Sequence, residues 1–163
     1  MSARTLVLVR HADAAHRAMR DDQRDLTAAG LLRARALGAL LAVRIGAADL
    51  ALVSKAVRAR RTLERMRESL EVGEALVDES LYFAGPDELL EIADAVDVPA
   101  LLLVGHEPTI SETGLLLGDA DARRDLRRGV PTATALVLEV PEGAVLEAGA
   151  GLPIERITAP ERP

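Results

Sequence analysis

The chain has 163 residues, a usual size for one domain, and 49% of them are hydrophobic. It has no cysteine, which excludes disulfides, thiolate metal sites and a cysteine nucleophile, and its net charge of -6 argues against nucleic-acid binding. There is no signal-peptide pattern, and no run approaches the roughly 18 apolar residues that a membrane helix needs. We expect one cytoplasmic domain, 1–163, with a frayed tail over 159–163.

The first half of the chain alternates aliphatic runs, which predict buried strands, with segments of helical periodicity. In chain order these are a strand over 4–9, a polar loop over 12–29, a helix from Thr27 to about Arg44, a strand over 50–53 and a helix over 57–70. Arg10 and His11 directly follow the first strand, and Ser54 follows the second.

The second half continues this alternation. It predicts a loop over 78–86, a helix over 87–96, a strand over 100–104, a helix over 109–117, a charged segment over 119–131, a strand over 133–140 and weaker edge strands over 145–147 and 154–157. His106 stands just after the strand over 100–104. Strands that alternate with helices predict an α/β fold, a three-layer sandwich with a mainly parallel central sheet and helices on both faces.

Chemically active side chains follow three strands of this sheet, at His11, Ser54 and His106. Ligands of such sheets bind beyond the carboxyl ends of the strands, so we expect these residues to meet at one rim. Arg10 leaves its strand together with His11, and Arg58 lies in the first turn of the next helix. Two arginines and two histidines beside helix N-termini predict a pocket for a phosphoryl group.

His11 is the candidate nucleophile of this pocket. An unprotonated imidazole nitrogen can attack phosphorus and hold the phosphoryl group until water hydrolyses the intermediate. A backbone carbonyl near residues 12–14 would then fix the other ring nitrogen. Arg10, Arg58 and a protonated His106 would stabilise the charge on the transferring group.

Four stretches carry a resemblance to a known family. They read Leu8-Val9-Arg10-His11-Ala12, Arg24-Asp25-Leu26-Thr27-Ala28-Ala29-Gly30, Ser54-Lys55-Ala56-Val57-Arg58-Ala59-Arg60-Arg61-Thr62 and Val104-Gly105-His106-Glu107-Pro108. Over residues 4–140 the chain resembles the histidine phosphatase superfamily, or phosphoglycerate mutase-like group, and within it the short SixA-type phosphohistidine phosphatases. The resemblance implies a phosphoglycerate mutase-like fold and phosphorylation of His11. It also implies a phosphate pocket of Arg10, Arg58 and His106 that needs no metal or cofactor.

Three positions depart from the family's motifs: Ala12 stands in place of glycine, and Asp25 and Lys55 stand in place of proline. None of these changes removes a catalytic group. If position 12 required a positive φ, alanine there would cost about 1 kcal/mol.

Larger members of the family carry an acid that protonates the leaving oxygen, and here its position is open among Glu79, Asp78 and Asp13. Such an acid assists poor alkoxide leaving groups. Phosphohistidine needs less help because imidazole leaves easily. The sequence therefore favours phosphohistidine in proteins as the substrate.

Two other functions stay open. A small-molecule phosphomonoesterase would use Glu79 or Asp78 as its acid, and a phosphate-binding or phosphoprotein-docking module would show little turnover. The expected partner is a phosphorylated protein or a small phosphorylated molecule, without nucleic acid or membrane, and the expected state is a monomer. Outside the pocket, the alternatives for His16 are a solvated loop residue or, together with His11 and His106, a zinc ligand. The arginines at 17, 20 and 24 belong to a solvated loop or line the substrate mouth, and those at 123, 124, 127 and 128 form a charged surface or a docking face for an acidic partner. For Tyr82 and Phe83 the alternatives are core packing or a pocket wall.

Overall fold

The computed structural model describes residues 3–162 and contains alternating strands and helices. In chain order the elements are β1 (Arg4–Arg10), the 3-10 helix η1 (Asp21–Gln23), α1 (Ala28–Ile45), β2 (Ala47–Val53), α2 (Val57–Met66), β3 (Glu71–Val77), the 3-10 helix η2 (Glu79–Tyr82), α3 (Pro86–Ala95), β4 (Ala100–Gly105), α4 (Thr109–Leu117), α5 (Ala120–Leu126), β5 (Thr134–Val140) and β6 (Glu155–Thr158). Within these residues no helix is long and apolar enough to cross a membrane.

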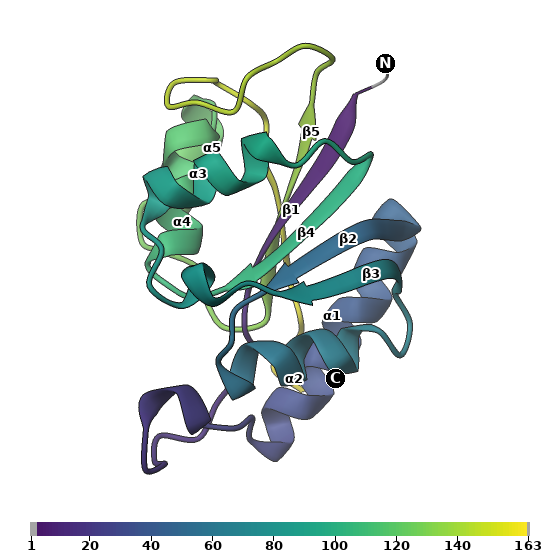
Figure 1. The fold of residues 1–163 in the computed structure, drawn as a ribbon, viewed down its shortest axis with the longest axis vertical. Coiled ribbons are helices and arrows are strands. Elements are labelled where there is room, and N and C mark those ends of the chain that lie inside the picture. Colours follow the sequence, from purple (N-terminus) through teal and green to yellow (C-terminus); the bar gives the residue numbers. More distant parts are fainter. Residues whose placement is uncertain (1–2, 163) are drawn as a thin grey trace.

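The strands form one sheet in the order β3-β2-β4-β1-β5-β6. β1 to β4 are mutually parallel, whereas β5 runs antiparallel to its neighbours β1 and β6. Figure 1 shows α1 and α2 on one side of the sheet and α3, α4 and α5 on the other. The predicted three-layer α/β sandwich with a mainly parallel sheet is confirmed.

Aliphatic side chains cover both faces of the central strands, as expected of a sheet buried between two helical layers. Because successive residues of a strand point to opposite faces, Val7 and Val9 pack in the core beneath α1 and α2. Leu6 and Leu8 pack in the second core, beneath α3, α4 and α5. This double burial holds the carboxyl end of β1 rigidly in the middle of the sheet, where His11 follows.

The predicted start of α1 at Thr27 is confirmed, because the Thr27 side chain accepts a hydrogen bond of 3.0 Å from the backbone N–H of Gly30. The second helix is shorter than expected and ends at Met66. The chain then turns and enters β3, a strand that the sequence analysis did not predict. β3 is an edge strand whose residues are mostly exposed, so it shows no aliphatic run.

Two expectations for the C-terminal region are wrong. Residues 145–147 form no strand, because the backbone N–H of Leu146 donates to the Asp94 carboxylate instead of to a neighbouring strand. The predicted frayed tail does not include Ala159, which is buried. Its N–H donates to Ala133 O and its carbonyl accepts from Arg33.

Candidate active site

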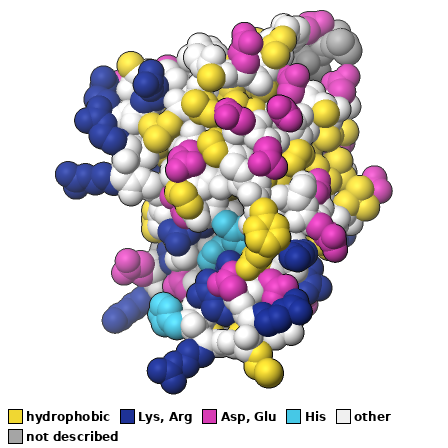
Figure 2. Space-filling model, turned by 60° about the vertical axis from the view of Figure 1, so that its left-hand side comes forward, with side chains coloured by type: hydrophobic (Ala, Val, Ile, Leu, Met, Phe, Trp, Pro, Cys, Tyr) yellow, Lys and Arg dark blue, Asp and Glu magenta, His cyan; other side chains and the backbone are white. Residues whose placement is uncertain are grey.

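The carboxyl ends of β1, β2 and β4 lie side by side and bring the predicted residues together. Backbone hydrogen bonds from His11 N to Gly105 O (3.1 Å) and from Ser54 N to Val104 O (3.0 Å) connect the three strand ends. The His11 and His106 rings lie 5.4 Å apart, and Arg58 Nε lies 3.3 Å from His11 Nε2. Figure 2 shows histidine on this face with Lys, Arg and acidic side chains around it.

One ring nitrogen of His11 is fixed by the backbone. Nδ1 lies 2.7 Å from Ala12 O, and because a carbonyl only accepts, Nδ1 carries the hydrogen. Nε2 therefore keeps its lone pair. Burial, and then the neighbouring His106 and Arg58, lower the pKa of His11 to about 3, so the ring is neutral at pH 7. This is the state that a nucleophilic imidazole needs.

Arg58 is buried and makes contacts on both sides of its guanidinium. Its two terminal nitrogens donate to Asp21, one to the backbone carbonyl (2.8 Å) and the other to the carboxylate (3.0 Å). The Tyr82 hydroxyl donates to the same carboxylate. These hydrogen bonds, that of Tyr82 first, lower the pKa of Asp21 to about 2. The sequence analysis missed Asp21, which begins η1 within a polar segment that has no periodicity.

His106 is anchored by the residue that follows β2. Its Nε2 lies 2.8 Å from Ser54 Oγ, while its Nδ1 is buried without a hydrogen bond to the described residues. Burial, followed by the charge of Arg58, lowers the pKa of His106 to about 4. The expected protonated form is therefore not the resting form at neutral pH, because burial and the charge of Arg58 both penalise a further positive charge on His106.

A chain of contacts fixes Arg10 at the end of β1. One terminal nitrogen of Arg10 donates to Val130 O (2.7 Å), and Val130 N donates to the Glu107 carboxylate (3.2 Å). Glu107 also accepts from the backbone N–H of Ser111 (2.7 Å). Arg10 Nε is buried and has no hydrogen-bond partner among the described residues. Burial lowers the pKa of Arg10, while Glu107 raises it.

Ala12 fits its position without backbone strain. Ala133 is the non-glycine residue of the described chain that has a positive φ, 53°, so Ala12 avoids the left-handed region. The N–H of Ala12 donates to Thr62 Oγ1 (2.9 Å), which in turn donates to Arg58 O (2.7 Å). Thr62 thus connects the loop after His11 to the helix that carries Arg58.

The three candidate acids differ in their surroundings. Asp13 binds the buried Arg33 (2.6 Å) and the hydroxyl of Thr132. Asp78 caps η2 by accepting from the backbone N–H of Ser80 (3.0 Å). Glu79 is exposed in η2. Two of the three candidates therefore already hold the fold together. Within residues 3–162 no group of three His, Asp or Glu is placed to hold a metal ion.

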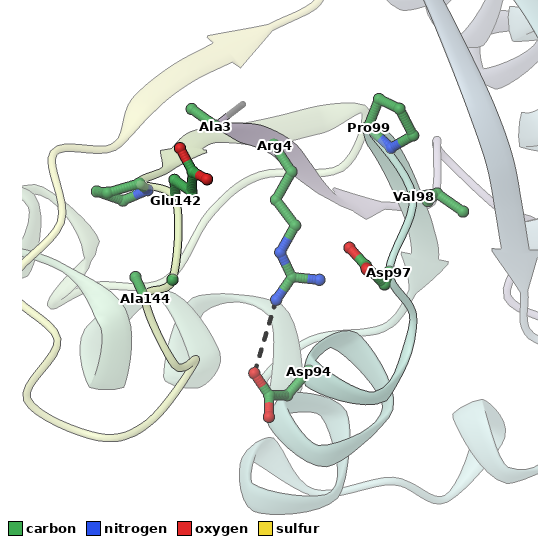
Figure 3. Close-up of a pocket in the computed structure, with 10 residues that line it drawn as sticks. Ala3, Arg4, Asp94, Asp97, Val98, Pro99, Glu142 and Ala144 are labelled. Atoms are coloured by element: carbon green, nitrogen blue, oxygen red, sulfur yellow. Dashed lines mark ion pairs between the residues drawn. The ribbon is translucent and has the colours of Figure 1, made fainter. Parts of the chain in front are cut away.

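A hollow of about 480 Å³ lies at the opposite end of the sheet, around the start of β1 (Figure 3). Arg4 crosses it, donates to the carbonyls of Ala93 (3.2 Å) and Val96 (2.7 Å), and lies 3.6 Å from Asp94. Arg4 thereby satisfies carbonyls at the C-terminal end of α3. His11, Arg58 and His106 lie at the other end of the strands.

Comparison with solved structures identifies the family. A protein assigned as the phosphohistidine phosphatase SixA of Nakamurella multipartitia is 34% identical, with a TM-score of 0.78 and 98% of each chain covered. The chain belongs to the histidine phosphatase superfamily. Another structure of this superfamily, assigned as SixA of Agrobacterium tumefaciens, is 31% identical, with a TM-score of 0.73 over 83% of this chain and 91% of that chain.

Two further proteins are similar to this histidine phosphatase in sequence or in fold. An uncharacterised protein of Mycobacterium tuberculosis H37Rv is 34% identical over 140 residues, which are 81% of this chain and 87% of that protein. A SixA structure complexed with tungstate shares the fold at 21% identity, with a TM-score of 0.77 over 94% of this chain and 96% of that chain. No protein-family model matches the chain. The predictions of a phosphatase and of a phosphoglycerate mutase-like fold are confirmed.

Proposed function

We propose that this histidine phosphatase is a metal-independent phosphohydrolase that forms a phosphohistidine on His11 and acts on phosphohistidine in proteins. The observation that carries the proposal is the hydrogen bond from His11 Nδ1–H to Ala12 O (2.7 Å). It leaves an unprotonated Nε2 beside Arg58 Nε, within a rim of positive charge.

In the first step the lone pair of His11 Nε2 attacks phosphorus, and the bond from phosphorus to the substrate's imidazole nitrogen breaks. The departing imidazole keeps that electron pair and leaves as a neutral ring when its other nitrogen already carries a proton. In the second step the oxygen of a water molecule bonds to phosphorus and the bond from His11 Nε2 to phosphorus breaks. The water's protons pass to phosphate and solvent, and His11 returns to its starting state.

Arg10, Arg58 and His106 are the proposed phosphate ligands. Arg10 Nε and His106 Nδ1 are buried polar atoms without a hydrogen bond to the described residues, and a buried unpaired group costs about 1–3 kcal/mol. Phosphate oxygens beside these atoms would remove that cost. An anion would also raise the depressed pKa of His106, so His106 would gain its proton as phosphate binds.

Two features favour a phosphohistidine substrate. Asp13 and Asp78 are already engaged in the fold, so neither is free to protonate a poor leaving group. His106 is also partly exposed, so the site can be reached from the surface. A phosphorylated side chain that projects from a protein would reach such a site without entering a deep cavity.

Mass spectrometry under non-acidic quench conditions tests the mechanism. After brief exposure to an activated aryl phosphate, the protein is expected to carry a phosphoryl adduct on His11, with or without a metal chelator. His11→Ala should carry none, and His16→Ala, which changes an exposed loop histidine, should behave like the unmodified protein. Turnover without an adduct on His11, or full activity of His11→Ala, would contradict the mechanism through a phosphohistidine intermediate.

A small-molecule phosphomonoesterase is the second candidate, because Glu79 is exposed in the same 3-10 helix that ends at Tyr82. If Glu79 protonates a leaving alkoxide, Glu79→Gln will slow hydrolysis of an alkyl phosphate and spare an aryl phosphate. Glu88→Gln, an exposed change in α3, is the matched control. Equal rates for Glu79→Gln and the unmodified protein on both substrates would remove this candidate.

A further inference from the structure

The aromatic residues of this protein are concentrated at the active site. The chain has one Tyr, one Phe and no Trp, and its cores are built from aliphatic side chains. Tyr82 ends η2 and is partly buried, while Phe83 follows it and is 78% exposed. Tyr82 packs against the edge of the core that α1 and α2 cover, but core packing does not account for the position of Phe83.

The two rings extend outward from His106. The centroids of His106 and Tyr82 lie 5.5 Å apart with an interplanar angle of 89°, and those of Tyr82 and Phe83 lie 4.6 Å apart at 84°. Both contacts are edge-to-face, which is a favoured geometry for aromatic pairs. The hydrogen bond from the Tyr82 hydroxyl to Asp21 fixes the middle ring. The exposed ring of Phe83 is thereby held against Tyr82, one ring away from the proposed phosphate ligand His106.

The single lysine of the chain stands against the same two rings. Lys55 directly follows Ser54, which contacts His106, and its Nζ lies 5.3 Å from the Tyr82 centroid and 5.6 Å from the Phe83 centroid. These distances lie within the range of cation–π contacts. An ammonium group at this place attracts an anionic substrate to the surface that the aromatic rings form.

A surface of this kind selects the shape of the group attached to phosphorus. Aromatic faces bind planar rings through offset or edge-to-face contacts, beyond what buried area alone supplies. We propose that Tyr82, Phe83 and Lys55 form a leaving-group subsite that binds the planar ring of a phosphorylated imidazole or an aryl phosphate. This inference rests on the proposed function, since it places the departing ring next to the phosphate that Arg10, Arg58 and His106 bind.

Calorimetry with non-hydrolysable probes tests the subsite without turnover. Phenylphosphonate and cyclohexylphosphonate have similar size and the same phosphonate group, but only the first has a planar ring. We expect the unmodified protein to prefer phenylphosphonate by roughly two- to tenfold, the range that aromatic pairs supply. Phe83→Leu, which keeps an apolar side chain, should lose this preference, and Phe83→Tyr should retain it. An unchanged preference in Phe83→Leu, or none in the unmodified protein, overturns the subsite.

Kinetics identify which planar group is the natural one. If Phe83→Leu lowers kcat/KM for a phosphohistidine peptide, the subsite takes an imidazole; if it lowers kcat/KM only for phenyl phosphate, the subsite takes an aryl group. If Phe83→Leu leaves kcat/KM unchanged for both substrates, the subsite is overturned. In that case a phosphoryl adduct on His11 still supports the proposed function. Absence of both the adduct and phosphonate binding overturns the proposed function and the subsite together.

Discussion

Arg58 contacts both His11 and Asp21, and Asp21 has two opposite effects on the proposed phosphate pocket. Its Nε faces His11, while its terminal nitrogens bind the carbonyl and carboxylate of Asp21. With a pKa lowered to about 2, the Asp21 carboxylate is negatively charged at neutral pH. Asp21 therefore holds the guanidinium in place and also neutralises part of the positive charge that would attract phosphate.

Asp21→Asn is expected to tighten the binding of inorganic phosphate about fivefold, because an exposed charge interaction is worth about 1 kcal/mol. The asparagine oxygen still accepts from Arg58 but no longer repels the anion. The measurement is the inhibition constant of phosphate. Asp22→Asn, in which the neighbouring acid loses its pairing with Arg20, is the control and should change little. Weaker phosphate binding in Asp21→Asn would mean that orienting Arg58 outweighs repulsion.

There is a physical reason why the sequence predicted His11 and His106 as site residues but did not predict Asp21. His11 and His106 follow aliphatic strands, and the parallel arrangement brings strand ends to one rim. Their proximity could therefore be predicted from order along the chain. Asp21 begins the short helix η1 within a polar segment whose path depends on contacts with Arg58 and Tyr82, which are distant in sequence. No periodicity encodes such a contact.

Among the elements, the turn between β4 and α4 connects the fold to the proposed phosphate pocket. Glu107 in this turn accepts hydrogen bonds from the backbone of Ser111 and from Val130, whose carbonyl binds Arg10. The turn thereby fixes the segment that holds a proposed phosphate ligand. The sequence analysis placed Glu107 only within a motif. In the structure its carboxylate positions Arg10 through Val130.

Glu107→Ala is expected to lower kcat/KM about tenfold or more, because displacing a positioning contact near the chemistry misplaces Arg10. The expected signature is weaker inhibition by phosphate together with slower turnover of an activated aryl phosphate. Glu112→Ala, an exposed change in the first turn of α4, is the matched control. Phosphate inhibition that stays unchanged in Glu107→Ala would contradict this role.

The packing of α1 on α2 depends on a glycine. A methyl group on Gly38 would lie 2.5 Å from the Cα and 2.8 Å from the carbonyl carbon of Met66, and backbone atoms there have little freedom to move. Gly38→Ala should therefore lower the free energy of unfolding by about 1–3 kcal/mol, although alanine favours an isolated helix. Urea unfolding measures the change. Ala39→Gly, at an exposed neighbour, should cost about 1 kcal/mol through helix propensity alone. A more stable Gly38→Ala would disprove the close contact.

Elements with a buried aliphatic pattern could be predicted, and those without one could not. β1 and β4 lie in the centre of the sheet and consist mainly of apolar residues, so the sequence predicts both. In β3 only Val72 is buried, because this edge strand pairs on one side alone. Its exposed glutamates and its glycine are equally compatible with a loop. The segment forms a strand because it pairs with β2, a contact that the sequence pattern does not encode.

At the scale of the whole molecule, the fold buries two histidines in their neutral form. Both stand at the end of central strands, and burial is the main reason that their pKa values fall from 6.5 to about 3 for His11 and about 4 for His106. The unfolded chain exposes both rings to water, where they titrate near 6.5. Protonation of these rings is therefore coupled to unfolding.

Because the folded site disfavours protonation of both rings, the protein is expected to become less stable as the pH falls. As the pH falls from 6.5 toward 4, the unfolded chain binds protons that the folded site excludes, so the free energy of unfolding falls by up to roughly 1.4 kcal/mol per pH unit for each histidine. Urea titrations at several pH values measure this slope. His11→Asn and His106→Asn should each reduce it, whereas His16→Asn, at an exposed position, should not. A slope that survives in the double variant His11→Asn/His106→Asn would assign the acid lability to other groups. Asp21 is not such a group in this range, because its depressed pKa affects stability only below about pH 4.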